Sequence, residues 1–243
     1  MVYLTPTTNL LTKLIRTVGK KLVRDFSEIE KLQSSIRGTN QFAKKTKEKI
    51  KKELFFSLKE IKPDYNFLID GLDQIKKNSN FTWVINPLSG YTNFLHSIPH
   101  FCISVAIIEN FEIISSVVYD PIKDEIFYAA KGKGAYLNDS RLRVSNRSLP
   151  SQSIIFLDSK FNYDHKSKEN KVISEFKTTR KTGCSDLDLC YVASGRSEVF
   201  YKCSVVKTFI SAGLLIVKEA GGLVEEFYNN KQNNYFVSNR LCH

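Results

Sequence analysis

The chain has 243 residues, of which 42% are hydrophobic and 25% charged, and its formal net charge is +11. This length can bury a core for one compact unit or two closely joined lobes, and the composition is ordinary for a globular protein. No apolar run reaches the ~18 residues of a membrane-spanning helix, and residues 1–11 lack a signal-peptide pattern. We therefore expect a cytoplasmic protein without membrane contact.

The basic charge raises the question of nucleic-acid binding. Lysine is frequent throughout the chain, with a dense stretch over residues 44–52. The apolar residues Ile50, Leu54 and Phe55 make this stretch typical of the polar side of an amphipathic helix. Since no base-stacking motif accompanies it, nucleic-acid binding is not our expectation. Lysines clustered on one part of the fold would be the mark of the alternative.

Cysteine usage points to a reducing environment. The five cysteines are odd in number and none forms Cys-x-x-Cys, so we expect buried thiols and no disulfide framework or zinc site. They are Cys102, Cys184, Cys190, Cys203 and Cys242.

Two long helices are predicted before the first sheet. Apolar residues recur at helical spacing over residues 10–32. The segment Arg37-Gly38-Thr39-Asn40 predicts a turn, and a second helix is predicted over residues 43–61, ending before Pro63.

The pattern then changes to short strands. Runs with tight turns predict an antiparallel meander, and after Ser151 helices alternate with strands. We divide the chain into an N-terminal lobe, 1–150, and a C-terminal lobe, 151–243, of a layered α+β protein. The predicted strands are 67–69, 82–85, 103–109, 112–119, 125–129, 135–137, 153–157, 199–202 and finally 223–227; the later helices are 166–176, 186–194 and 209–220, the last closed by Gly221-Gly222.

One segment carries a family resemblance. Residues 83–94 read Trp-Val-Ile-Asn-Pro-Leu-Ser-Gly-Tyr-Thr-Asn-Phe. This resembles the inositol monophosphatase signature, Trp-x-Ile-Asp-Pro-Ile/Leu-Asp-Gly-Thr-Thr-Asn-Phe. Further matches follow in the family's order at residues 99–101, 104–106, 118–121, 132–135, 182–185 and 218–222.

The resemblance implies an α-β-α-β-α sandwich of the inositol monophosphatase and fructose-1,6-bisphosphatase type, usually a homodimer. It also implies Mg²⁺-dependent hydrolysis of a phosphate monoester, in which metal ions activate water and stabilise the leaving oxygen. Mg²⁺ prefers hard oxygen ligands, mainly carboxylates. The resemblance assigns the catalytic positions to Asp70, Tyr91 and Thr92; the metal positions to Asp70, Asn86, Leu88, Ser89 and Phe209; and the phosphate and substrate positions to Gly90, Tyr91, Thr92, Gly183, Cys184, Ser185 and Lys202.

Most of these positions depart from the family pattern. The signature aspartates are Asn86 and Ser89, and Leu88 offers only its backbone carbonyl. Of seven acidic positions implied by the family, only Asp70 is still acidic. The others hold Gly71, Lys47, Asn86, Ser89, Lys202 and Phe209. Cations at two of them would repel a divalent metal ion.

We therefore expect a catalytically impaired family member, a pseudo-phosphatase with no bound magnesium or only weakly bound magnesium. Two alternatives remain: a residual Mg²⁺-dependent phosphatase acting on inositol monophosphate or a similar monoester, and a non-catalytic protein that binds a partner or RNA. For the pocket itself two interpretations stay open, namely that it holds a phosphate or sulfate anion without metal, or that Tyr91 fills it. Cys184 is expected to be structural, and Asp186 and Asp188 to be a cap and a solvated or buried pair rather than replacement ligands.

Overall fold

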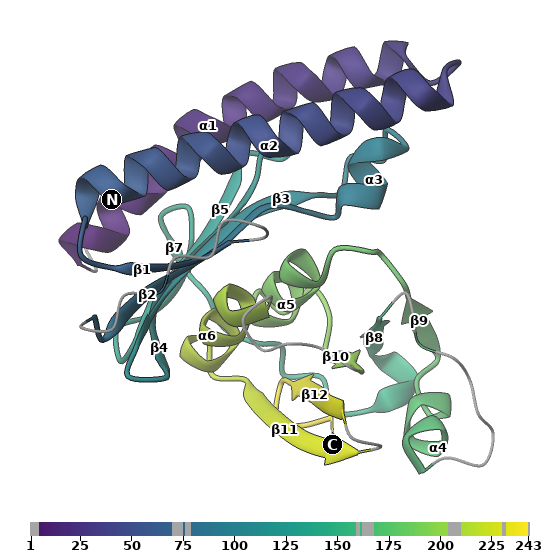
Figure 1. Cartoon of the computed structure of the whole chain (residues 1–243). Coiled ribbons are helices and arrows are strands. Elements are labelled where there is room, and N and C mark those ends of the chain that lie inside the picture. Colours follow the sequence, from purple (N-terminus) through teal and green to yellow (C-terminus); the bar gives the residue numbers. More distant parts are fainter. Residues whose placement is uncertain are drawn as a thin grey trace.

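The computed structural model describes residues 5–69, 75, 79–158, 161, 168–203, 210–229 and 232–242. Its elements form five layers (Figure 1). Helices α1 and α2 cover one face of a seven-stranded sheet, and α5 and α6 lie between this sheet and a five-stranded second sheet. Helix α4 lies beyond the second sheet. The predicted α-β-α-β-α sandwich is confirmed, while the division into lobes at residue 150 stays a prediction.

The two N-terminal helices are longer than the sequence pattern predicted. Helix α1 spans Pro6–Lys31 and its N-cap is Thr5, whose side chain accepts a hydrogen bond from the Thr8 amide. Helix α2 spans Ile36–Ile61. The predicted turn at residues 37–40 was wrong, because the Ser35 hydroxyl caps the amide of Gly38 and the helix begins before the glycine.

The first sheet has the strand order β1-β2-β3-β4-β5-β6-β7. Strands β1 and β2 are parallel, and every later neighbouring pair is antiparallel, so the predicted meander is confirmed from β2 onward. The bounds are Asn66–Ile69 (β1), Phe81–Ser89 (β2), Cys102–Glu109 (β3), Glu112–Asp120 (β4), Glu125–Ala130 (β5), Gly134–Leu137 (β6) and Ser140–Arg141 (β7), with the short helix α3 at Tyr91–Leu95.

The second sheet has the order β11-β12-β10-β8-β9. The strand at residues 223–227 was predicted to be the last one. This was wrong, because its hairpin partner β12 follows it. The polar start of β12, Gln-Asn-Asn, hides the alternation that marks a strand. The bounds are Ile154–Leu157 (β8), Thr178–Arg180 (β9), Val199–Lys202 (β10), Leu223–Asn229 (β11) and Gln232–Ser238 (β12), with a 3-10 turn at Pro150–Gln152 and α4 at Lys168–Ser174.

The middle layer consists of α5 (Ser185–Ala193) and α6 (Ser211–Glu219), both of which are almost entirely buried. The two helices approach closely at Gly213, where a Cβ atom would lie only 2.6 Å from the Leu189 side chain. This layer brings the first turn of α5 to the end of β2, where the signature lies. Among the described residues, no helix is both long enough and apolar enough to cross a bilayer.

Candidate functional site

The signature segment folds as a strand, a tight turn and a short helix. Strand β2 ends at Ser89, and Gly90 adopts a left-handed conformation with φ of 82° before α3 begins. A Cβ atom at Gly90 would lie 2.8 Å from the carbonyl oxygen of His100. Glycine is therefore required here both by backbone conformation and by close contact. The turn holds the predicted positions Asn86, Ser89 and Tyr91 near one another.

A carboxylate from a distant part of the chain enters this site. Asp186 lies in the first turn of α5 and is only 1% exposed. Its Oδ2 atom accepts hydrogen bonds from Asn86 Nδ2 at 3.5 Å and from Ser104 Oγ at 3.2 Å. Asp186 therefore takes part in a buried hydrogen-bond network with Asn86, where the family resemblance implies a metal ligand.

Burial dominates the electrostatics of Asp186. Removal from water raises the pKa of this carboxyl from 3.8 to about 6. Hydrogen bonds from Ser89, Ser104 and Asn86, together with the positive charge of Lys202, lower the pKa and so offset part of this effect. A carboxylate bound to a divalent cation would instead be held in its charged form.

Lys202 contributes the positive charge on the second-sheet side of the site. Its Nζ atom donates to Ser185 Oγ at 2.7 Å and lies 3.6 Å from Asp158 Oδ2. Three predicted substrate positions, Cys184, Ser185 and Lys202, are therefore adjacent at the start of α5. The ammonium group occupies a position where the family implies an acid.

The thiol predicted to be structural is buried. The Cys184 sulfur lies 3.7 Å from Cys102 Sγ and 3.6 Å from Ser89 Oγ. The sulfurs are not bonded, and burial raises the pKa of Cys102 well above its usual value. Four of the five cysteines are buried, as predicted, whereas Cys203 is partly exposed.

The loop before α5 is joined to α3 by Asn93. Its amide donates to the carbonyl oxygens of His100 at 2.7 Å and Thr182 at 2.8 Å. Gly183 is left-handed, with φ of 82°, beside this amide. Asp188 accepts a 2.5 Å hydrogen bond from the Thr182 hydroxyl, and its burial raises its pKa. Both aspartates of α5 are thus buried, and the solvated alternative is wrong.

Tyr91 is the first residue of α3, the helix of the signature that contacts α2. It is partly buried and packs against the core under the N-terminal helices. Lys47 Nζ lies 5.8 Å from the centre of its ring. Thr92, the next predicted position, is exposed. The tyrosine and the lysine thus pack together at two positions where the family implies a threonine and an acid.

Two predicted metal positions, Asp70 and Phe209, lie outside the described residues. Leu88 is 3% exposed and belongs to the core. Across the described part of the chain, no group of three or more histidine, cysteine, aspartate or glutamate residues could hold a metal ion.

The described residues do not fit the magnesium ions that the family implies. Mg²⁺ needs several hard oxygen ligands in nearly octahedral geometry. Here one buried carboxylate is hydrogen-bonded to an amide and a hydroxyl, and the Lys202 ammonium is close enough to influence its pKa. These residues therefore do not support a catalytic step through a metal ion.

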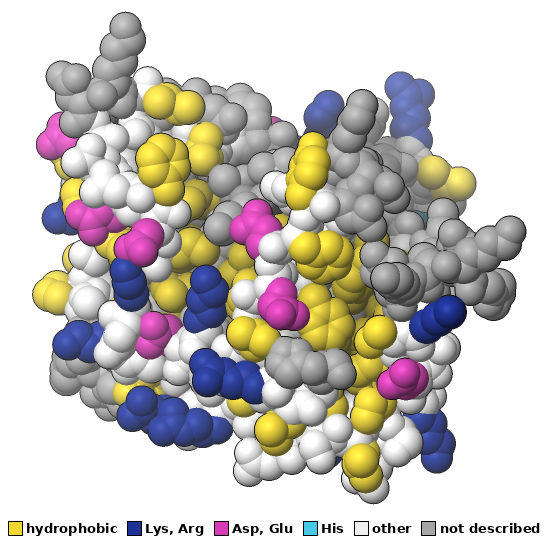
Figure 2. Space-filling view, turned by 90° about the horizontal axis from the view of Figure 1, so that it is seen from below, with side chains coloured by type: hydrophobic (Ala, Val, Ile, Leu, Met, Phe, Trp, Pro, Cys, Tyr) yellow, Lys and Arg dark blue, Asp and Glu magenta, His cyan; other side chains and the backbone are white. Residues whose placement is uncertain are grey.

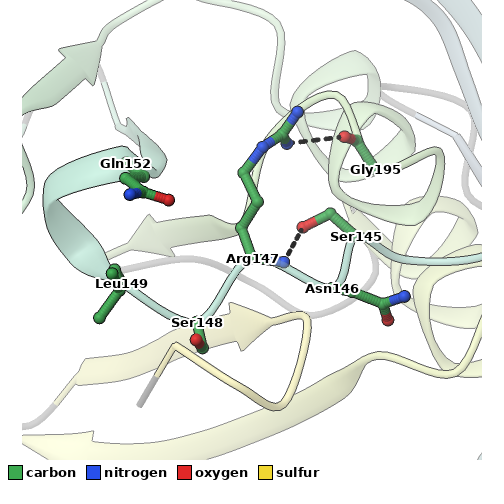
Figure 3. A pocket seen from close by; sticks show the side chains of 7 residues that line it. All are labelled: Ser145, Asn146, Arg147, Ser148, Leu149, Gln152 and Gly195. Carbon is green, nitrogen blue, oxygen red and sulfur yellow. Dashed lines mark hydrogen bonds between the residues drawn. The ribbon is translucent and has the colours of Figure 1, made fainter.

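A second hollow lies away from the signature (Figure 3). It has a volume of about 460 Å³ and Arg147 points across it. The guanidinium donates to the buried Glu198 at 2.6 Å and to the Gly195 carbonyl at 3.3 Å. Because this cation is already bonded within the protein, the hollow offers no unpaired charge to a ligand. Its lining residues are Ser145, Asn146, Arg147, Ser148, Leu149, Gln152 and Gly195.

Sequence reasoning missed the site roles of Asp186 and Ser104. They are separated by 82 residues, and Asp186 is 100 residues from Asn86, so no local spacing reveals the contact. The signal that could have found it is an acid directly after Gly183-Cys184-Ser185, a segment already matched to the family's substrate loop.

Comparison with known proteins agrees with the fold and the signature. The model of the inositol monophosphatase family matches residues 3–242. An inositol-1-monophosphatase of Rhizobium meliloti is 37% identical over 88% of this chain and 83% of its own length. A Xylella fastidiosa protein named Nus factor SuhB is 32% identical over 91% of this chain and 82% of its own. The crystal structure of extragenic suppressor protein suhB from Bartonella henselae superposes with a TM-score of 0.83 at 30% identity, covering 98% of this chain and 95% of that one. The chain belongs to the inositol monophosphatase family.

Proposed function

We propose that this chain is a pseudo-phosphatase: it keeps the family scaffold but has little or no metal-dependent phosphatase activity. One observation carries the proposal, namely the buried network in which Asp186 accepts hydrogen bonds from Asn86 and Ser104. Neutral amide and hydroxyl groups occupy the signature positions Asn86 and Ser89. The carboxylate of Asp186 is already hydrogen-bonded within the protein, to Asn86 and Ser104. Magnesium would be absent or weakly held, because the described residues supply too few anionic oxygens.

The cations at the former acidic positions support the same proposal. Lys202 is bonded to Ser185 and lies near Asp158, so its ammonium is fixed inside the site. Lys47 lies against the Tyr91 ring. Both positive charges would repel a divalent ion, and at short range in a protein interior such repulsion amounts to several kcal/mol.

The loss of this chemistry leaves a folded scaffold available for binding. Some relatives carry the name Nus factor SuhB, while others carry the name inositol-1-monophosphatase. A role in binding a partner is therefore the second part of the proposal, and a homodimer is the assembly that we propose from the family resemblance. Of the two interpretations of the pocket, Tyr91 filling it is favoured by its packing against the core.

The test is release of phosphate from inositol 1-phosphate over a range of magnesium concentrations. The unmodified chain should show no magnesium-dependent turnover. The same assay is run on a variant that combines Asn86→Asp, Ser89→Asp and Asp186→Ser, with Phe209→Asp added to complete the family ligands.

Binding of Mn²⁺ is measured by calorimetry in both proteins. It shows whether missing activity comes from missing metal ligands or from missing contacts with the substrate. Circular dichroism checks that the variant is folded. Metal binding that appears only in the variant would support the proposal. Magnesium-dependent turnover by the unmodified chain would overturn it in favour of a residual phosphatase.

A further inference from the structure

The positive charge of this protein is concentrated in one layer. Helices α1 and α2 contain fourteen lysine and arginine residues against six acids, a net charge of +8 out of +11 for the whole chain. On the side of the molecule turned away from these helices, basic, acidic and hydrophobic side chains are interspersed (Figure 2). The dense lysine stretch at residues 44–52 lies in this layer, and such clustering is the mark that we expected of a nucleic-acid-binding protein.

Helical spacing places many of these cations on the outer surface. On α2, lysines recur every seven residues at 45, 52 and 59, and all three are exposed. On α1, exposed cations stand at 13, 20, 24 and 31. Positions seven or eleven residues apart share one face of a helix, and buried residues occupy the opposite face. We call this surface the basic face: Lys13, Lys20, Arg24, Lys31, Lys45, Lys52 and Lys59.

Few acids neutralise the basic face. Asp25 is buried between the helices, where Lys49 and Arg24 approach it at 3.5 Å. Glu53 pairs with Lys21, and Glu28 pairs with Lys31. Within the described part of the chain, no acid forms an ion pair with Lys13, Lys20, Lys45 or Lys52. Four ammonium groups of this surface therefore face solvent alone.

A hollow on α1 supplies an independent feature of the same surface. It has a volume of about 220 Å³ and is lined by three cations, Lys13, Arg16 and Lys20, with the hydroxyls of Thr12 and Thr17. Ammonium, guanidinium and hydroxyl groups are the donors that proteins use for phosphate oxygens. Arg16 is also held by Asp124 at 3.1 Å, which fixes its orientation at the edge of the hollow.

We propose that the basic face binds the phosphodiester backbone of nucleic acid, with the α1 hollow receiving one phosphate group. The face extends for ~27 Å along α1, from residue 13 to residue 31, at 1.5 Å per residue. Two helices side by side, with axes ~9 Å apart, are too broad for a major groove about 12 Å wide. Binding is therefore to the backbone and independent of base sequence.

The experiment measures binding of a fluorescent single-stranded RNA of about 20 nucleotides as a function of salt concentration. With about five phosphate contacts, the logarithm of the binding constant should fall with the logarithm of salt with a slope of about −3.5. Two RNAs of different sequence should bind alike. The same measurement is made with duplex DNA and with polyglutamate. It shows whether the surface binds nucleic acid or any acidic polymer.

A charge-matched pair of variants locates the site. The first carries Lys20→Gln, Lys45→Gln and Lys52→Gln on the basic face. The control carries Lys133→Gln, Lys171→Gln and Lys177→Gln, at exposed positions elsewhere, and loses the same net charge. The first should lose affinity for RNA on the order of a hundredfold at 0.1 M salt, with a slope smaller by about 2. The control should bind as the unmodified chain does.

Equal losses in the two variants would show that only net charge matters, and this would overturn the proposal. Binding of polyglutamate but not of RNA would overturn it as well. The outcome is independent of the pseudo-phosphatase proposal, because none of the substituted lysines lies at the signature. A chain active on inositol 1-phosphate could still bind RNA, and an inactive one could fail to bind it.

Discussion

Replacing Asp186 by asparagine measures how far the ionised carboxylate, which is buried beside the signature, lowers the free energy of unfolding. Burial raises the pKa of this group from 3.8 to about 6. Because the folded state holds the proton more tightly than the unfolded state, ionisation of Asp186 destabilises the fold. The cost is absent below about pH 4, increases as the pH rises, and is fully present above about pH 6. The difference between the two pKa values corresponds to roughly 3 kcal/mol.

Asparagine has nearly the same shape and its carbonyl can still accept from Asn86 and Ser104. The Asp186→Asn variant should therefore gain up to roughly 3 kcal/mol over the unmodified chain at pH 8, and almost nothing at pH 4. Urea unfolding followed by fluorescence of Trp83, which is fully buried and the only tryptophan, measures both free energies.

A solvent-exposed carboxylate provides the matched control. The Asp64→Asn substitution removes the same charge at a surface turn and should give no comparable gain at pH 8. The reasoning would be refuted if Asp186→Asn changed the free energy of unfolding by the same amount at both pH values. A variant less stable than the unmodified chain at pH 8 would refute it too.

Three further substitutions test the local geometry. Gly90→Ala should lower the melting temperature, because its Cβ atom would lie 2.8 Å from the His100 carbonyl at a φ of 82°; an unchanged thermal unfolding curve would contradict this. Phe101→Ala, at a fully buried ring, should cost ~3–5 kcal/mol in urea unfolding, and a cost below ~1 kcal/mol would mean that the core collapses around the gap. Ser35→Ala removes the cap of α2 and should cost about 1 kcal/mol, whereas Ser35→Gly should cost less; equal costs would rule out capping by the hydroxyl.

Much of the fold could be predicted from hydrophobic spacing. The long amphipathic helices and the β-branched strands of the first sheet carry strong periodic patterns, and the structure places most of them within a few residues. The errors fall where local chemistry overrides the pattern. A serine cap starts α2 at Ile36, seven residues before the predicted start at residue 43, and β12 pairs through its backbone although the strand begins with polar residues.

The sequence predicts which residues occupy the signature of the candidate site, but not which distant side chains contact them. Residues 83–94 identify which side chains stand at the signature, because this segment is continuous in sequence. Asp186 comes from a helix in another layer, and the packing of α5 against β3 and β4 of the first sheet brings it to Asn86 and Ser104. A tertiary contact of this kind has no signature in a single sequence.

Gly213 has a mechanical consequence for this contact. Because Gly213 has no side chain, the backbone of α6 contacts Leu189 of α5 directly, and the two helices are closely packed at this point. The helix that bears Asp186 lies beside α6 in the middle layer, with β3 and β4 of the first sheet on one face and β10 and β12 of the second sheet on the other. A rigid-body retreat of α5 from the first sheet would press it into the second sheet, and a sideways shift would meet α6, so the packing on these sides holds the acid in place.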